Sequence, residues 1–141
     1  MIKGIAASGM AICFLAACGA KQPDCGSNAT ISTLKEFFKK YPDNVLFEWG
    51  FYEQHKRKNP GNLLEDRAYK DEESNAAASA SWKVELIRTL SKNPETQAVS
   101  CVAKVSVTAP GWDDWAERQV NYTAQYTTEG QLYVEVKWRG S

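Results

Sequence analysis

The sequence predicts an α+β fold in which N-terminal helices pack on one face of a four-stranded antiparallel meander. Apolar residues recur at three- and four-residue spacing in the first part of the chain, and at every second position from residue 81 onward. The stretches of period two are joined by short turns, which suit antiparallel neighbours and are too short for parallel crossovers. With 141 residues the chain has room for one domain.

Residues 28–41 are predicted to form the first helix. Ser27 or Asn28 can cap its start, and Pro42 ends it. Its apolar residues share one helix face, which we expect to cover the sheet. They are Ile31, Leu34, Phe37, Phe38 and Tyr41.

A second helix is predicted to begin after Asp43, which can cap it, and to turn polar over residues 53–58. A buried strand over residues 45–52 is the alternative, because that run is nearly continuous in apolar and aromatic residues. The sequence alone leaves both open.

The segment before the sheet carries weaker signals. Residues 59–62 (Asn-Pro-Gly-Asn) predict a turn, and residues 63–69 a short helix. Residues 70–79 show little apolar periodicity and are predicted to be a loop.

The strands are predicted over residues 81–90, 99–108, 116–126 and 132–139. Their alternation gives one apolar and one polar face, so the helices should cover one side only. Cys101 falls on the apolar face. The same alternation places Arg88 beside Trp82 and Leu86, where we expect it to be partly buried and paired with an acid.

Residues 1–17 have the pattern of a secretory signal. Lys3 is their only charged residue, and the uncharged run over residues 4–17 is too short for a comfortable membrane span. The run ends in Leu15-Ala16-Ala17-Cys18, which resembles the lipobox of bacterial lipoproteins. The alternative is an ordinary secretory signal followed by a chance cysteine.

The lipobox resemblance implies that Cys18 becomes the first residue and carries the lipid that anchors the protein to a membrane. Residues 18–24 would then be a lipidated tether, and residues 25–141 a single α+β domain. Gly19 resembles the residue found in lipoproteins sorted to the outer membrane. The expected location is therefore the bacterial cell envelope, at the outer membrane and facing the periplasm.

Cysteine counting predicts a disulfide between Cys25 and Cys101. Cys13 leaves with the signal and Cys18 is acylated, so two thiols remain in an oxidising compartment. These two cysteines and the lone His55 do not supply the usual ligands of a zinc site, so no metal or cofactor is predicted.

Charge and chemistry restrict the function further. The formal net charge is zero, which argues against a nucleic-acid partner. His55 stands in a polar stretch with no serine, cysteine or metal partner suggested nearby in sequence. No catalytic residue is therefore predicted, and we expect the protein not to be an enzyme.

Several short motifs resemble a module of small bacterial lipoproteins and envelope proteins. They are Pro23-Asp24-Cys25, Leu86-Ile87-Arg88-Thr89, Cys101-Val102-Ala103-Lys104-Val105 and, loosely, residues 126–136. The resemblance implies a disulfide-linked helix packed on an antiparallel sheet, and it brings no catalytic residues.

The connection between the second and third strands is the best candidate for contact with a partner. It contains Trp112, Asp113, Asp114 and Trp115, between Pro110-Gly111 and the next strand. Loops at sheet ends often carry recognition, and tryptophan is enriched at binding hot spots. The alternative is that one or both indoles cap the end of the hydrophobic core.

Two classes of function fit these features. The first is a non-enzymatic protein-binding module that meets another envelope protein, as an inhibitor or immunity protein, an exclusion factor or a secretion accessory. The second is a small-ligand-binding or enzymatic domain of the cystatin or nuclear-transport-factor-like kind. Its pocket would lie between helix and sheet, lined by Trp49, Trp82 and Tyr122.

Overall fold

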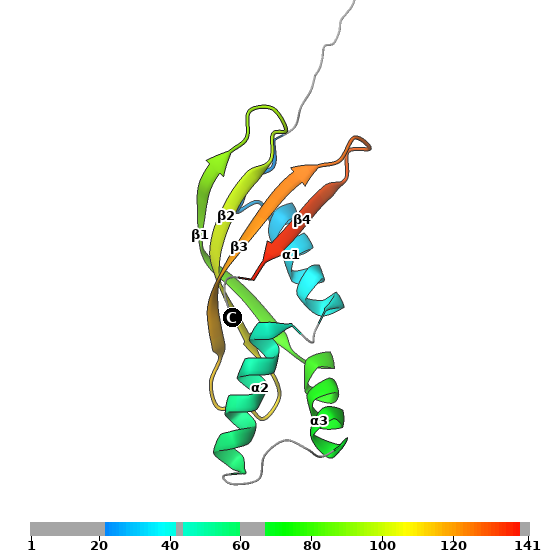
Figure 1. Cartoon of the computed structure of the whole chain (residues 1–141), viewed down its shortest axis with the longest axis vertical. Coiled ribbons are helices and arrows are strands. Elements are labelled where there is room, and N and C mark those ends of the chain that lie inside the picture. The colour runs from blue at the N-terminus through cyan, green and yellow to red at the C-terminus, as the bar shows by residue number, and fades with distance from the viewer. Residues whose placement is uncertain (1–21, 42–43, 60–66, 139–141) are drawn as a thin grey trace, which may run out of the picture.

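The computed structural model describes residues 22–41, 44–59 and 67–138. Three helices in this part precede a four-stranded antiparallel sheet, which confirms the predicted α+β meander (Figure 1). The helices are α1 (Asn28–Lys40), α2 (Val45–Lys58) and α3 (Arg67–Ala78). The strands, paired in chain order, are β1 (Ser81–Lys92), β2 (Val99–Thr108), β3 (Ala116–Tyr126) and β4 (Leu132–Lys137).

The helices cover successive parts of the long, twisted sheet. α1 packs on β4 and β1, whereas α2 packs on β3 and β2 and contacts α3. In Figure 1, α1 therefore lies beside the upper part of the sheet, and α2 and α3 lie beside its lower part. Alternate residues of β2 and β3 bury one continuous core beneath them, including Val105, Val107 and Val120.

α1 begins and packs largely as its sequence predicts. Ser27 caps it, because its side-chain oxygen accepts a hydrogen bond of 3.2 Å from the backbone N–H of Thr30. Phe38 is fully buried and stacks on Trp82 with ring centroids 4.7 Å apart. Tyr41 follows the helix and is 47% exposed, so it does not join the buried face. The predicted stop at Pro42 lies outside the described residues.

α2 is a helix, and the strand alternative is wrong. Asn44 caps it by accepting a hydrogen bond of 3.1 Å from the backbone N–H of Phe47. The buried positions Phe47, Phe51 and Gln54 follow helical spacing. Asp43, the predicted cap, lies outside the described residues.

The predicted loop over residues 70–79 is also wrong, because α3 occupies nearly all of it. Its sequence contains several alanines and glutamates, which favour helix without a strong apolar stripe. Tyr69 attaches α3 to the core in place of such a stripe, since its ring is buried and packs edge to face on Phe51 with centroids 5.0 Å apart. Residues 60–66, with most of the predicted turn and short helix, lie outside the described part.

β1 departs from strict alternation, and this corrects the expectation for Arg88. Glu85 pairs with Lys104 and Arg88 with Val102, so Leu86 and Ile87 share one place in the register. Leu86 adopts a φ of 51°, and its side chain is 73% exposed, while Ile87 packs against the core. Because this bulge shifts the alternation, Arg88 is exposed rather than on the apolar face.

Candidate functional site

The connection between β2 and β3 is held against the C-terminal half of α2. Gln54 is buried, and its side-chain oxygen accepts a hydrogen bond of 3.1 Å from the backbone N–H of Asp113. One turn later, Arg57 donates a hydrogen bond of 2.7 Å to Asp114, which raises the pKa of Arg57. Lys58 also donates a hydrogen bond to the carbonyl of Gly111. Three side chains of one helix thus fix the loop.

Trp112 lies inside this arrangement. Its ring is partly buried and stacks on Phe47 with centroids 5.4 Å apart. Gly50 allows the close approach, because a Cβ there would stand 2.7 Å from the Cβ of Ala116 and 2.9 Å from the Trp112 ring. Trp112 therefore packs at the end of the core, one of the two roles that its sequence position suggests. Gly50 was not singled out from the sequence, where it stands inside a run of apolar and aromatic residues.

Trp115 lies on the surface instead. It is 38% exposed, and the Lys83 ammonium stands 4.3 Å from its ring centroid. On α2, Trp49 is 51% exposed and lines a groove of about 470 Å³ with Val45, Glu117 and Arg118. We call Val45, Trp49 and Trp115 the distal surface.

The distal surface is centred on the contact between α2 and the start of β3. Trp49 directly precedes Gly50, and Trp115 directly precedes Ala116, the two residues that meet most closely there. Trp49 therefore stands next to this contact on α2, whereas Trp115 lies against Lys83, on the sheet face opposite to that of Ala116. Asp113 and Asp114 are exposed beside Trp115.

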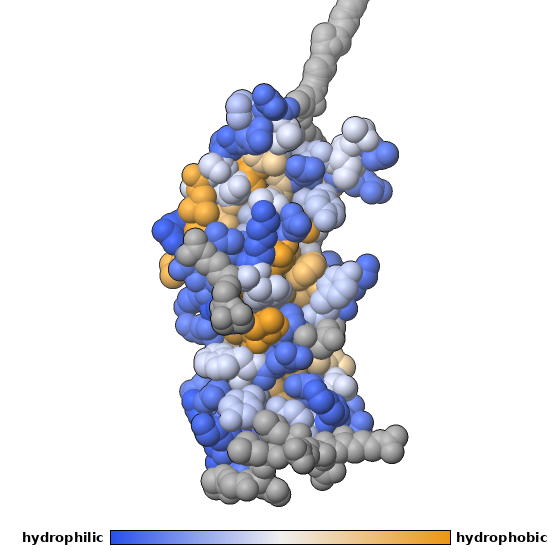
Figure 2. All heavy atoms as spheres, in the orientation of Figure 1, coloured by the Kyte–Doolittle hydropathy of each residue, from blue (hydrophilic) through white to orange (hydrophobic). Residues whose placement is uncertain are grey.

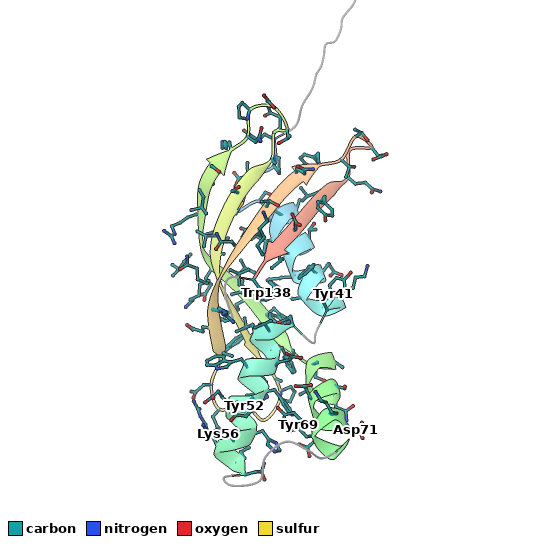
Figure 3. The ribbon with its side chains drawn as sticks, in the orientation of Figure 1. Tyr41, Tyr52, Lys56, Tyr69, Asp71 and Trp138 are labelled. Carbon is teal, nitrogen blue, oxygen red and sulfur yellow. A yellow bond between two sulfur atoms is a disulfide. The ribbon has the colours of Figure 1, made fainter. Side chains whose placement is uncertain are left out.

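A separate cleft of about 410 Å³ opens between α2, α3 and the β2–β3 connection. His55 and Glu72 line it, with Nδ1 and Oε2 4.0 Å apart. The His55 ring packs edge to face on Tyr69 at 4.8 Å, and Tyr69 lies between α2 and α3 (Figure 3). Glu72 was not predicted as a neighbour of His55, because the sequence pattern places it in a loop.

The three residues predicted to line a pocket between helix and sheet do not lie together. Trp82 and Tyr122 are buried in the core, whereas Trp49 is on the surface of α2. In the described part of the chain, no group of three or more His, Cys, Asp or Glu side chains could hold a metal ion.

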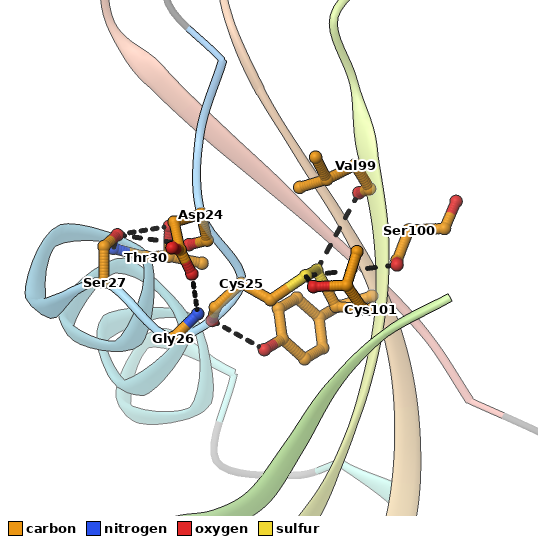
Figure 4. The surroundings of a disulfide bond; sticks show 10 residues. Asp24, Cys25, Gly26, Ser27, Thr30, Val99, Ser100 and Cys101 are labelled. Atoms are coloured by element: carbon orange, nitrogen blue, oxygen red, sulfur yellow. Dashed lines mark hydrogen bonds between the residues drawn. A yellow bond between two sulfur atoms is a disulfide. The ribbon is translucent and has the colours of Figure 1, made fainter. Parts of the chain in front are cut away.

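The opposite end of the molecule carries the predicted disulfide. Cys25 and Cys101 are bonded, with sulfurs 2.05 Å apart, and both residues are buried (Figure 4). The hydroxyl of Tyr122 donates a hydrogen bond of 2.9 Å to the Cys25 carbonyl. Burial, and to a lesser degree the charge of Asp24, raise the pKa of Tyr122 to about 12.

The disulfide and the β2–β3 connection are separated by most of the length of β2. Cys101 stands near the start of this 10-residue strand, and the β2–β3 connection follows its end. At about 3.3 Å per residue the strand spans roughly 30 Å. In Figure 1 the chain enters at the end that carries the β1–β2 turn, and α2, α3 and the β2–β3 connection form the other end.

None of the described helices has both the length and the apolar character needed to cross a bilayer. Cys18 lies outside the described residues. Comparisons with protein-family models, with curated proteins and with solved structures gave no match for the chain.

Proposed function

We propose that this protein is a non-enzymatic envelope lipoprotein that binds another envelope protein through its distal surface. One observation carries the proposal: Trp49 and Trp115 are both exposed, and each directly precedes one of the two residues, Gly50 and Ala116, at which α2 meets β3. Exposed tryptophans held by a rigid framework are typical anchors of protein interfaces. The fixed β2–β3 connection supplies that framework.

The anchoring part of the proposal rests on residues 1–18. The signal pattern and the lipobox-like Leu15-Ala16-Ala17-Cys18 support lipidation at Cys18, with the domain at the outer membrane facing the periplasm. The disulfide between Cys25 and Cys101 supports an oxidising compartment. A tethered protein-binding module suits an inhibitor or immunity protein, an exclusion factor or a secretion accessory.

Binding can be tested with matched surface variants. The acylated protein, purified from envelope extracts, is compared with Trp49→Ala plus Trp115→Ala for capture of its partner. We expect at least a tenfold loss of affinity, because both anchors are removed. The control is Tyr41→Ala plus Tyr133→Ala, which removes aromatic rings of similar exposure (47% and 53%) elsewhere on the surface. Equal binding by both double variants would contradict the proposed surface.

Anchoring can be tested by labelling cells with a palmitate analogue. We expect Cys18→Ala to lose the label and to retain its signal segment. Cys13→Ala is the matched control, because it removes a cysteine of the signal and should keep the label. Full labelling of Cys18→Ala would show that this residue is not the acylation site.

A second candidate function, small-ligand binding or catalysis, is favoured by the His55–Glu72 cleft. Its lining combines aromatic surface from Phe51 and Trp112 with polar side chains, as ligand pockets do. A ligand that co-purifies with the protein and is lost in His55→Gln would favour this alternative. Retention of partner binding in that variant would favour the distal surface.

A further inference from the structure

Two leucines of the edge strand β1 point out of the fold. Leu86 is 73% exposed and Leu90 is 53% exposed. Both stand at register shifts between β1 and β2, one between Glu85 and Arg88 and the other between Thr89 and Ser91. Figure 2 shows hydrophobic side chains along the side of the molecule on which β1 lies.

The backbone at Leu86 makes this exposure costly. Its φ of 51° lies in the left-handed region, which a residue with a bulky side chain rarely adopts. A strained backbone that holds an apolar side chain in water points to a surface that is covered in use.

Basic side chains accompany the leucines. Arg88 lies between them and Lys92 ends the strand, and both are exposed. Leu86 and Arg88 line one shallow groove of about 520 Å³ on the face of the sheet away from the helices. Two carboxylates stand nearby, and both pair with Lys104, Glu85 at 3.6 Å and Glu117 at 3.4 Å.

The chain enters the domain next to this segment. Thr89, between Arg88 and Leu90, donates its hydroxyl to the Cys25 sulfur at 3.4 Å. Ile87 lies 4.0 Å from the position that a Cβ of Gly26 would take. Fully extended, residues 18–24 reach at most about 25 Å. A lipid on Cys18 would therefore keep β1 close to the bilayer.

We propose that residues 86–92 of β1 rest on the bilayer that holds the lipid anchor. Leu86 and Leu90 enter the interfacial region, while Arg88 and Lys92 bind anionic lipid headgroups. This inference rests on the proposed acylation of Cys18, which raises the effective concentration of a contact that is weak by itself. The β2–β3 connection with Trp115 follows the other end of β2, whereas the groove beside Trp49 shares Glu117 and Arg118 with the groove at Leu86.

Photo-crosslinking of the acylated protein in its native envelope tests the contact. A benzophenone amino acid replaces Leu86, Leu90 or, as a control, Tyr133, which is as exposed as Leu90 but lies on β4 at the other edge of the sheet. We expect lipid adducts at positions 86 and 90 at least five times as abundant as at position 133. An intact Cys25–Cys101 disulfide, checked by mass, shows that each variant is folded.

Three other outcomes of the crosslinking would contradict the bilayer contact. Adducts to a protein at positions 86 and 90 would show that a protein partner covers β1. An adduct to residues 1–17 would show that the signal segment covers it, and equal lipid adducts at all three positions would mean unspecific contact. Each of these outcomes overturns the proposal.

Palmitate labelling separates this inference from the proposed function. Labelled Cys18 without lipid adducts on β1 would overturn the bilayer contact alone. Absence of the label would overturn the anchor and this inference with it. Neither result affects partner binding by Trp49 and Trp115.

Discussion

The hydroxyl of Tyr122 donates a hydrogen bond to the backbone carbonyl of Cys25, across 97 residues of sequence. Tyr122 is 1% exposed and pairs with Cys101 in the register of β2 and β3. The start of α1 is therefore tied to the sheet twice, by the disulfide and by this hydrogen bond. The two ties fix the point at which the chain enters the domain.

Tyr122→Phe should lower the free energy of unfolding by about 1–2 kcal/mol, because it leaves the buried Cys25 carbonyl without its donor. Urea unfolding at pH 7 measures the change. Tyr133→Phe is the control, since that hydroxyl belongs to an exposed side chain. A similar small effect of both variants would mean that the hydrogen bond contributes nothing to stability.

The raised pKa of Tyr122 predicts a loss of stability at high pH. The pKa of Tyr122 is 10.0 in the unfolded chain and about 12 in the fold. Between pH 10 and pH 12 the unfolded chain therefore loses the tyrosine proton, while the folded protein keeps it. The stabilisation is complete below pH 10 and is lost as pH rises through 12. Wild type should therefore lose more stability than Tyr122→Phe between pH 9 and pH 11.5, measured by urea unfolding. Parallel losses would contradict the assignment.

Removing the disulfide should cost more than removing the hydrogen bond. Cys25→Ser plus Cys101→Ser opens a crosslink with a sequence separation of 76, for which chain entropy gives about 4.5 kcal/mol as an upper figure. Urea unfolding of the variant, and of wild type with and without reductant, measures the loss. A midpoint unaffected by reductant would show that the bond adds no stability.

Gly50→Ala should destabilise the protein by about 1–3 kcal/mol, because the added methyl group overlaps Ala116 and Trp112. Gly26→Ala is the matched control. Its Cβ would meet its nearest atom, an Asp24 oxygen, at 3.8 Å, which is an ordinary contact. Thermal unfolding compares the two variants. An unchanged Gly50→Ala would mean that α2 can move away from β3 at no cost.

The meander could be predicted because period-two alternation persists through most of each strand. The phase of β2 places Cys101 on the buried face, which supports its pairing with Cys25 independently of the cysteine count. α1 was predictable for a similar reason, since its apolar residues follow one helical period.

The remaining features depend on contacts that no local pattern records. α3 is held by Tyr69 against Phe51 rather than by an apolar stripe of its own. The bulge and the left-handed backbone conformation at Leu86 occur without a glycine that could have indicated them in the sequence. The packing of Trp112 depends on the space left by Gly50, a residue more than 60 positions earlier in the chain. Tertiary packing decided each of these cases.

The two tryptophans of the β2–β3 connection should therefore respond differently to substitution. Trp112→Ala should lower the free energy of unfolding by about 3 kcal/mol, because it removes a ring packed on Phe47. Trp115→Ala should change it by less than about 1 kcal/mol, since that ring is 38% exposed. Urea unfolding measures both. Equal losses would mean that the two indoles share one structural role.

Leu86→Asn should stabilise the protein, although it removes an apolar side chain from a strand. The left-handed region costs a residue with a side chain roughly 1–2 kcal/mol, and asparagine tolerates that region better than leucine. Because Leu86 is 73% exposed at a φ of 51°, little burial is lost in exchange. We expect a gain of about 0.5–1 kcal/mol by urea unfolding.

Leu90→Asn is the control, because Leu90 is 53% exposed and is not among the residues with positive φ. It should be neutral or slightly destabilising, since asparagine is a poor strand residue. If Leu86→Asn lost as much stability as Leu90→Asn, the exposed leucine would be stabilising the fold itself. If it gained stability and reduced the lipid adducts at position 90, the strain at Leu86 would be tied to a bilayer contact.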